Sequence, residues 1–323
     1  MALMRGVRLA AGLPATAAFA YRTVGRLAGV FDALVAPLVD EIVRDPGERR
    51  RARKALREMS LKIGYAVLSY ARMTGRGEPM EVAALAGAVT RLYDDLMDGG
   101  DDPALDDRLS DLFQARPFAP AGDLERLLAE LCYRIAHRLH PLADAGPFLA
   151  LAELHGFQCQ SRRQREPGLP RDVLEKITRG KGALANLTLC SLVRPDLGRR
   201  ERELVMALGE AFQSLDDCMD VDLDRRNGVR TLASTGALTL SDVARRMREL
   251  RPRLVDAYGA KAARPYCGMI YVLLLKAVMA RRLPLVGRLL RRAAARSAGL
   301  AVFVRGDDAL PPARSEGAGR EVP

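Results

Sequence analysis

Apolar residues recur at three- and four-residue spacing in almost every segment of this 323-residue chain. That spacing matches the turn of an α-helix and gathers the apolar side chains on one face. We find no run of alternating β-branched residues, the usual pattern of a strand. The helical segments are separated by polar stretches rich in Gly and Pro, at residues 44–50, 74–79, 98–107, 115–123, 165–172, 194–200 and 226–231. The sequence therefore predicts an all-α fold of about ten helices.

The chain is long enough to bury a sizeable core, and its apolar fraction of 49% is ordinary for a soluble globular protein. We expect one large helical bundle over residues 46–305, preceded by a basic and apolar N-terminal extension over residues 1–45. Residues 306–323 are polar and rich in Pro and Gly, and we expect them to be disordered.

The two ends of the chain raise the question of membrane contact. Residues 1–20 imitate a signal peptide, but Arg8 and Pro14 interrupt the apolar stretch. The chain has no uninterrupted apolar run of the length that a bilayer requires, so we expect no spanning helix. Residues 276–305 contain Lys276 and seven Arg without any acid. This segment could lie on a membrane surface, or it could pack its Leu face on the core with its Arg side chains solvated.

The formal net charge of +11 indicates attraction to a polyanion. Nucleic-acid binding is not predicted, because the chain has no groove-reading motif and no basic patch interleaved with aromatic residues. An anionic membrane surface or a phosphorylated substrate remains open.

The five cysteines, none in a Cys-x-x-Cys pair, are typical of reduced, buried thiols in a cytoplasmic protein: Cys132, Cys159, Cys190, Cys218 and Cys267. His137 and His140 are three residues apart on a predicted helix, but no further ligand lies near them in the sequence. We interpret both histidines as structural.

A first cluster of aspartates ends a helical segment. Residues 82–93 are almost wholly apolar, which predicts a buried helix, and Asp94, Asp95 and Asp98 follow at its C-terminal end. The helix dipole disfavours negative charge at that end. Carboxylates placed there need a compensating cation.

A second cluster places Asp216, Asp220 and Asp224 four residues apart, with Asp217 beside them. The spacing predicts one helix with a stripe of like charges, which repel one another. Core-facing apolar residues bracket this stripe, so it too needs a cation or open water.

Carboxylates without His or Cys partners suit hard divalent cations, Mg²⁺ above all. Mg²⁺ is commonly held by a few carboxylates together with substrate phosphate oxygens. A single Asp-rich loop is more often a solvated turn. Two clusters with Asp-Asp-x-x-Asp spacing, each joined to an apolar helix, favour a metal site above an apolar cavity. Such a site could remove diphosphate from a hydrocarbon chain.

The chain resembles the all-α isoprenoid synthases. "DDLMD" (94–98) matches their first aspartate-rich motif, and "FQSLDDCMD" (212–220) is similar to the second motif of trans-prenyl diphosphate synthases. "RGKGALAN" (179–186) resembles the helix that carries their diphosphate-binding Lys, here Lys181. "DRRNGVRTL" (224–232) resembles the ending of the second motif and adds Arg230. The resemblance covers about residues 50–260 and implies an isoprenoid synthase fold, a bundle around a central apolar cavity.

The second motif also resembles that of squalene and phytoene synthases, which places Asp220, Asp224 and Arg226 in metal and phosphate roles. The Y-x-x-x-V-A-G signature of that branch is absent. Chain-elongating relatives carry G-G-K-R-x-R-P upstream of the first motif, whereas this chain has Leu61 and Ile63 at the positions of those arginines. Loss of that second-substrate site favours a class I terpene synthase.

The resemblance thus implies three Mg²⁺ ions bound by the two clusters: Asp94, Asp95, Asp98, Asp216, Asp217, Asp220 and Asp224. Diphosphate would be bound by Lys181, Gln213, Arg226 and Arg230. The expected substrate is an allylic prenyl diphosphate, of C15 or C20 because Ala86, Val89 and Thr90 before the first Asp are small. Few aromatic residues, eight Phe and eight Tyr, argue against elaborate cyclisation.

Two alternatives remain open at this stage. One is a trans-prenyltransferase, which either elongates a chain or joins two chains head to head. The other is a catalytically silent partner subunit, although both aspartate motifs are intact here. Relatives commonly form homodimers, so the resemblance also implies a homodimer. The cysteines favour a cytoplasmic location, where the basic C-terminal segment could contact a membrane.

Overall fold

The computed structural model describes residues 2–100, 102–139 and 146–282 of the chain. Within these ranges every regular element is helical, which confirms the predicted all-α class. The elements in chain order are α1 (Ala2–Leu34), α2 (Ala36–Ile42), α3 (Pro46–Met73), α4 (Met80–Asp98), α5 (Pro103–Phe113), α6 (Asp123–Leu139), α7 (Gly146–Ser161), the 3-10 helix η1 (Arg162–Arg165), α8 (Arg171–Ser191), α9 (Arg199–Met219), α10 (Val221–Arg226), α11 (Leu240–Tyr258) and α12 (Ala260–Arg282).

Local sequence signals set several of these boundaries. Helix α3 begins where the Asp45 side chain accepts a hydrogen bond from the backbone N–H of Glu48, with Pro46 at the first helical position. Helix α11 begins with a capping box, in which Thr239 and Asp242 each bind the other's backbone N–H. Helix α9 ends at Met219, and Asp220 lies between α9 and α10. The single helix predicted over the second aspartate cluster is therefore interrupted at Asp220.

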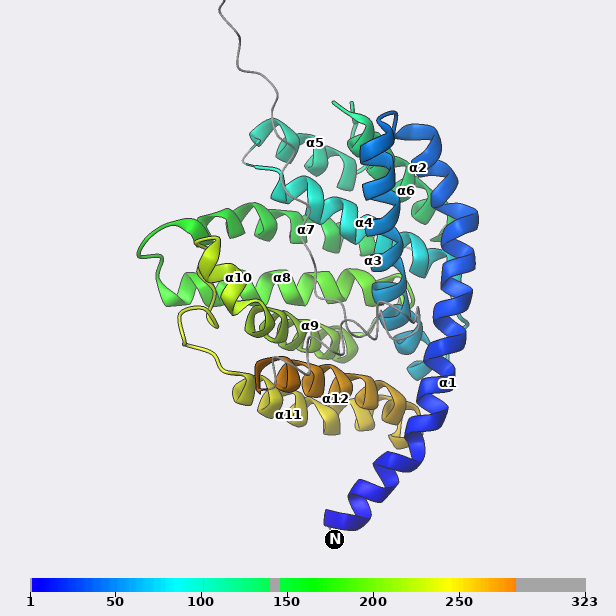
Figure 1. Cartoon of the computed structure of the whole chain (residues 1–323), viewed down its shortest axis with the longest axis vertical. Helices are drawn as coiled ribbons and strands as arrows, with labels where there is room; N and C mark the ends of the chain where they lie inside the picture. Colours follow the sequence, from blue (N-terminus) through cyan, green and yellow to red (C-terminus); the bar gives the residue numbers. More distant parts are fainter. Residues whose placement is uncertain (1, 101, 140–145, 283–323) are drawn as a thin grey trace, which may run out of the picture.

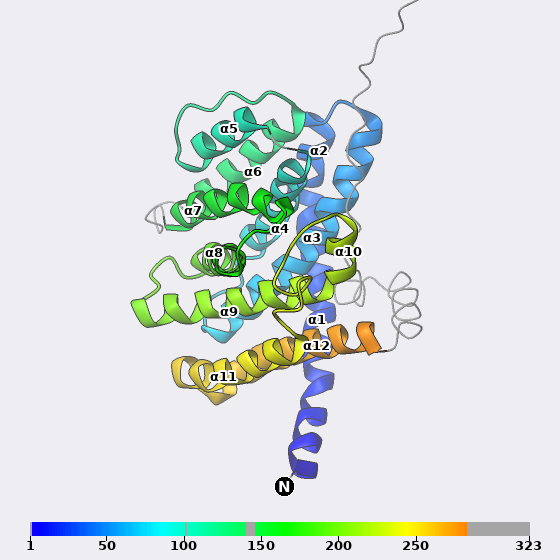
Figure 2. The same cartoon turned by 90° about the vertical axis from the view of Figure 1, so that its left-hand side faces the viewer.

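Helices α5, α6, α7, α8, α9 and α11 follow one another along the long axis of the molecule (Figure 2). Helix α1 runs alongside them, and α11 and α12 lie together at the end near the N-terminus (Figure 1). Two large apolar clusters fill the interior, one around α3, α8, α9, α11 and α12, the other around α2, α4, α5 and α6. The core also extends N-terminal to residue 46, because α1 contributes Leu27 and Phe31 without measurable exposure. The division into three segments stays a prediction.

Helix α12 contains a stretch, Ala260–Met279, that is long and apolar enough to cross a membrane by length and composition. This finding differs from the expectation that the chain has no such segment. Tyr266, Ile270 and Leu274 on this helix are buried in the bundle, and 39% of the apolar stretch is buried in all. A mostly buried core helix of a soluble protein also meets these criteria, so length and composition alone are weak evidence for a membrane span. The basic segment that continues from Lys276 to residue 305 and the expected disordered tail lie almost entirely outside the described residues.

Glycine allows α8 and α9 to cross at backbone contact. A Cβ atom built on Gly182 would lie 2.4 Å from the backbone oxygen of Gly209, and one on Gly209 would lie 2.1 Å from the oxygen of Gly182. Asn186 secures the crossing by donating from Nδ2 to the carbonyl of Val205 at 2.6 Å. The crossing matters for function because Lys181 precedes Gly182, and the second aspartate cluster follows Gly209 by two turns.

We predict that Gly209→Ala destabilises the protein by about 2–3 kcal/mol, because overpacking a close contact forces the backbones apart. Chemical denaturation followed by circular dichroism measures this loss. Gly198→Ala is the matched control, since a Cβ at Gly198 meets no atom within 4 Å. Equal stability of the two variants would contradict the close crossing.

Candidate active site

One cavity of about 640 Å³ lies among α3, α4, α6, α7, α8, α9, α10 and α12. Its size falls within the roughly 300–1,000 Å³ that is usual for small-molecule sites. Apolar side chains form most of its wall, and they include the buried Cys132 and Leu192. Acidic side chains line it as well, and two of these, Asp98 and Asp216, are exposed to solvent. The cavity therefore has an acidic end at the surface and an apolar interior.

The first aspartate cluster reaches this cavity from the end of α4. Residues 82–89 of α4 are all buried, so the helix passes through the core before it ends at Asp98. Asp94 and Asp98 line the cavity. Asp95 is not among the lining residues. It forms an ion pair with Arg91 at 2.7 Å instead, and both side chains are largely shielded from solvent.

The second aspartate cluster reaches the same cavity from α9 and α10. The lining includes all four of its predicted members: Asp216, Asp217, Asp220 and Asp224. Backbone hydrogen bonds from Asp220 N to Asp216 O and from Asp224 N to Asp220 O keep the helical spacing across the break. The expected gathering of the two clusters on one cavity is therefore observed, with Asp95 as the exception.

Asp217 differs from its neighbours because it is buried, with 7% of its surface exposed. Its carboxylate accepts hydrogen bonds from Gln213 Nε2 at 2.9 Å and from Thr178 Oγ1 at 3.2 Å. Burial raises the pKa of Asp217 to about 6, and the negative charges of Asp216 and Asp224 add to this rise. The Gln213 hydrogen bond and the positive charge of Lys181 oppose it.

Lys181 on α8 lines the cavity beside these carboxylates, as the sequence predicts. Its charge opposes the rise in the pKa of Asp224, which burial raises above its ordinary value. Thr231 donates to Asp224 from Oγ1 at 3.2 Å and so fixes the carboxylate at the end of the second cluster. Six aspartates line the cavity against four basic side chains, so carboxylates outnumber positive charges there, which suits a hard cation.

Two predicted diphosphate-binding residues are not brought to the cavity. Arg226 is exposed and is not among the lining residues. Arg230 is also absent from the lining, and its Nη1 donates to the carbonyl of Leu169 at 3.3 Å. The backbone N–H of Arg230 donates to Gln164 O at 2.7 Å, which ties the loop after α10 to η1. In this structure Arg230 thus holds a loop together.

Besides Arg91, which pairs with Asp95, two further cations that the sequence did not single out line the cavity. Lys62 lies on α3 between Leu61 and Ile63, the two positions at which chain-elongating relatives carry arginines. Ile63 lines the cavity beside Lys62, whereas Leu61 is buried. Lys276 reaches the cavity from α12, on the same helical face as Met269 and Leu273. The three- and four-residue spacing along this stretch of α12 could have revealed Lys276 as a residue of a buried face.

The cavity is also richer in aromatic side chains than the low aromatic content of the chain suggests. Six of them line it: Tyr65, Tyr70, Tyr93, Phe148, Phe212 and Tyr266. Ala86, Val89 and Thr90, which were expected to form the floor of the pocket, line it as well. The argument from composition against cyclisation therefore loses most of its weight, because aromatic faces can stabilise cations.

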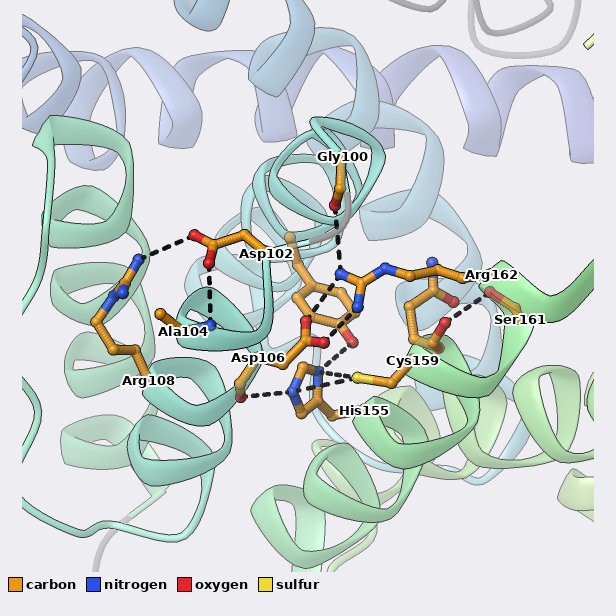
Figure 3. Close-up of polar contacts among 11 residues, drawn as sticks. Gly100, Asp102, Ala104, Asp106, Arg108, His155, Cys159, Ser161 and Arg162 are labelled. Atoms are coloured by element: carbon orange, nitrogen blue, oxygen red, sulfur yellow. Dashed lines mark hydrogen bonds and ion pairs between the residues drawn. The ribbon is translucent and has the colours of Figure 1, made fainter. Parts of the chain in front are cut away.

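A second polar cluster, hereafter the Tyr93 network, consists of Tyr93, Asp106, His155, Cys159 and Arg162. Figure 3 labels the last four of these residues. The side chains of Asp106, His155 and Cys159 offer ligand atoms that all lie within 4.8 Å of one another. However, Arg162 forms a bidentate ion pair with Asp106 and lowers the pKa of that carboxyl although burial opposes this. Burial raises the pKa of the Cys159 thiol to about 11, so the thiol stays protonated. These contacts fit a hydrogen-bonded network better than a metal site.

Comparisons with known proteins bear on the fold. No protein-family profile matches the chain, and no curated protein matches it in sequence. Among solved structures, a geranyltransferase from Legionella pneumophila is similar, with a TM-score of 0.55 and 16% identity. The match covers 82% of this chain and 99% of that chain. The chain therefore has the fold of an all-helical prenyltransferase, as the sequence motifs predict.

We predict that Asp217→Asn stabilises the metal-free protein at neutral pH. The pKa of Asp217 lies near 6 in the folded protein and at 3.8 ordinarily, so its ionisation costs stability above about pH 6 and costs little near pH 4. The melting temperature should rise by roughly 2–5 °C at pH 7.5 with a chelator present, and by only about half as much at pH 5. Thermal unfolding at both values measures this difference.

The control is Asp222→Asn, which removes an exposed carboxylate of α10. It should leave the melting temperature nearly unchanged at both pH values. An Asp217→Asn effect of equal size at pH 5 and pH 7.5 would count against the burial of an ionisable carboxylate in this cluster.

Proposed function

We propose that this chain is a Mg²⁺-dependent class I terpene synthase that ionises an allylic prenyl diphosphate. One observation carries the proposal: carboxylates from α4 and from α9–α10, together with Lys181, line the exposed end of a mostly apolar cavity. A diphosphate fits the acidic end once cations are bound, and a hydrocarbon chain fits the interior. The name of the structural neighbour, a geranyltransferase, agrees with a substrate of this class.

The donor set supports Mg²⁺ as the metal. Asp94 and Asp98 would hold it from one side of the cavity, and Asp216, Asp220 and Asp224 from the other, with three ions expected. When bound, Mg²⁺ supplies charge that stabilises the departing diphosphate. Lys181 adds a donor for the phosphate oxygens, and Gln213 and Thr178 keep Asp217 oriented behind the other carboxylates.

The interior of the cavity supports the rest of the reaction. Apolar walls keep water away from the allylic cation, so it can rearrange or cyclise before it is quenched. The aromatic rings that line the cavity can stabilise positive charge along the way. The small side chains of Ala86 and Val89 leave room for a C15 or C20 chain.

A specific observation favours the second candidate, a trans-prenyltransferase. Lys62 and Lys276 also line the cavity, so two further positive charges lie where a second diphosphate could bind. In that case isopentenyl diphosphate or a second prenyl chain would bind on the α3 and α12 side. For either reaction, we propose that the protein is a homodimer in the cytoplasm and that its basic C-terminal segment contacts a membrane.

We predict that Asp94→Asn, Asp216→Asn and Lys181→Ala each lower turnover of the best allylic diphosphate at least about 100-fold, a loss of about 2.7 kcal/mol of transition-state stabilisation. Released diphosphate measures the rate. Asp111→Asn is the control, since Asp111 pairs with Arg116 on the surface of α5 and should keep full activity. Full activity in the three site variants would refute the proposed site.

A separate incubation distinguishes the two candidate reactions. The protein with Mg²⁺ receives C10, C15 or C20 allylic diphosphate, each with and without isopentenyl diphosphate. We expect hydrocarbon or alcohol from a single substrate, at a rate that Lys62→Gln changes less than threefold. A longer diphosphate formed only when isopentenyl diphosphate is present, and lost in Lys62→Gln, would establish the second candidate instead. No product under any condition would favour a silent partner subunit.

A further inference from the structure

The end of α4 is held by the Tyr93 network, which joins four elements through buried contacts. The hydroxyl of Tyr93 and Nδ1 of His155 lie 2.9 Å apart, and Nε2 of His155 lies 2.9 Å from the backbone oxygen of Asp106. A carbonyl oxygen only accepts, so Nε2 carries the proton. Nδ1 then accepts from the hydroxyl of Tyr93.

Both partners are buried, with 4% of Tyr93 and 4% of His155 exposed. The two rings pack edge to face with each other and with the ring of Phe113, at centroid distances of 5.5–5.9 Å. Burial lowers the pKa of His155, so the ring stays neutral and keeps the tautomer that this network requires. The network therefore has one defined arrangement.

Arg162 extends the network to the other side of the first aspartate cluster. It donates from Nη2 to Asp106 at 2.8 Å and to the carbonyl of Gly100 at 3.4 Å, just beyond the end of α4 (Figure 3). The contacts at Tyr93 and Gly100 thus enclose the segment that carries Asp94 and Asp98. The end of the helix is fixed on both sides by α5, α7 and η1.

A fixed helix end matters because Asp94 directly follows Tyr93. A rotation of the helix by about 20° moves an atom about 5.5 Å from its axis by roughly 2 Å. Mg²⁺ requires nearly ideal geometry with oxygen distances of about 2.0–2.1 Å. A small rotation of this turn would therefore move the carboxylates out of coordinating range.

We infer that His155 is a positioning residue for the first aspartate cluster: through Tyr93 it sets the rotation of the last turns of α4, and so the placement of Asp94 and Asp98 for Mg²⁺. This inference rests on the proposed function of the cavity. His155 does not itself line the cavity, so it acts through Tyr93. Residues behind metal ligands commonly change metal affinity about 10- to 100-fold when altered.

The test measures the Mg²⁺ concentration for half-maximal turnover, together with the melting temperature in chelator. We expect His155→Leu and Tyr93→Phe each to raise the half-saturating Mg²⁺ concentration about tenfold or more. His155→Asn should recover most of the loss, because its Oδ1 can accept from the hydroxyl of Tyr93. The double variant Tyr93→Phe/His155→Leu should be no worse than the poorer single variant.

The control for lost stability is Ser60→Ala, which removes a buried hydrogen bond of 2.8 Å from Ser60 Oγ to the carbonyl of Ala84 on α4. It should lower the melting temperature and leave the Mg²⁺ requirement unchanged. If His155→Leu does not fold, Tyr93→Phe, which removes one oxygen atom, decides the question. An unchanged Mg²⁺ requirement in the variants of an active wild-type enzyme would overturn this inference alone. A wild-type protein that turns over no allylic diphosphate would overturn the proposed function as well.

Discussion

The structure depends on how carboxylates are placed at the ends of helices around an apolar cavity. Like charges repel, a helix C-terminus disfavours negative charge, and burial penalises an ionised side chain. All three costs act here, at Asp98 on the end of α4 and at the buried Asp217 near the end of α9. Lys181 offsets part of them. A bound divalent cation would offset the remainder. The electrostatic repulsion that destabilises the metal-free protein would therefore also favour binding of the cation.

The helices must hold these carboxylates close together although the carboxylates repel one another. The glycine crossing brings Lys181 on α8 close to the aspartates of α9, and the Tyr93 network holds the end of α4 from behind. Gly182, Gly209 and Tyr93 also line the cavity, so both contacts form part of its wall. Both determine where the lining side chains point. Preorganisation of this kind is what a site for a short-lived cation requires, because charge develops faster than a helix can move.

Sequence patterns predicted those features of the fold that depend on local spacing. The apolar run over residues 82–93 predicted the buried helix α4 with acids at its end, and the four-residue spacing of Asp216, Asp220 and Asp224 predicted a shared side. Lys181, which the motifs single out, lines the cavity, and its role in diphosphate binding stays a prediction. Spacing could not show that Asp217 turns inward while Asp216 stays exposed, because only packing against α8 distinguishes adjacent positions on a helix.

Contacts between residues far apart in sequence could not be predicted in this way. Tyr93 and His155 are separated by 62 positions, so no local pattern relates them. Arg226 and Arg230 match a motif but do not line the cavity of this structure, because a motif does not fix how its loop packs. Their role in diphosphate binding stays a prediction. The total aromatic content was also a poor guide, because it does not reveal that aromatic side chains gather around one cavity.

The most direct test of the central idea is the position of the metal. A crystal grown with Mn²⁺ and inorganic diphosphate, and measured at a wavelength where manganese scatters anomalously, would locate each ion without reference to activity. The account predicts anomalous peaks between the α4 aspartates and those of α9–α10, with carboxylate oxygens of Asp94 or Asp98 and of Asp216, Asp220 or Asp224 at coordinating distance. Peaks elsewhere, with both sets of carboxylates bound only to water or protein, would contradict it.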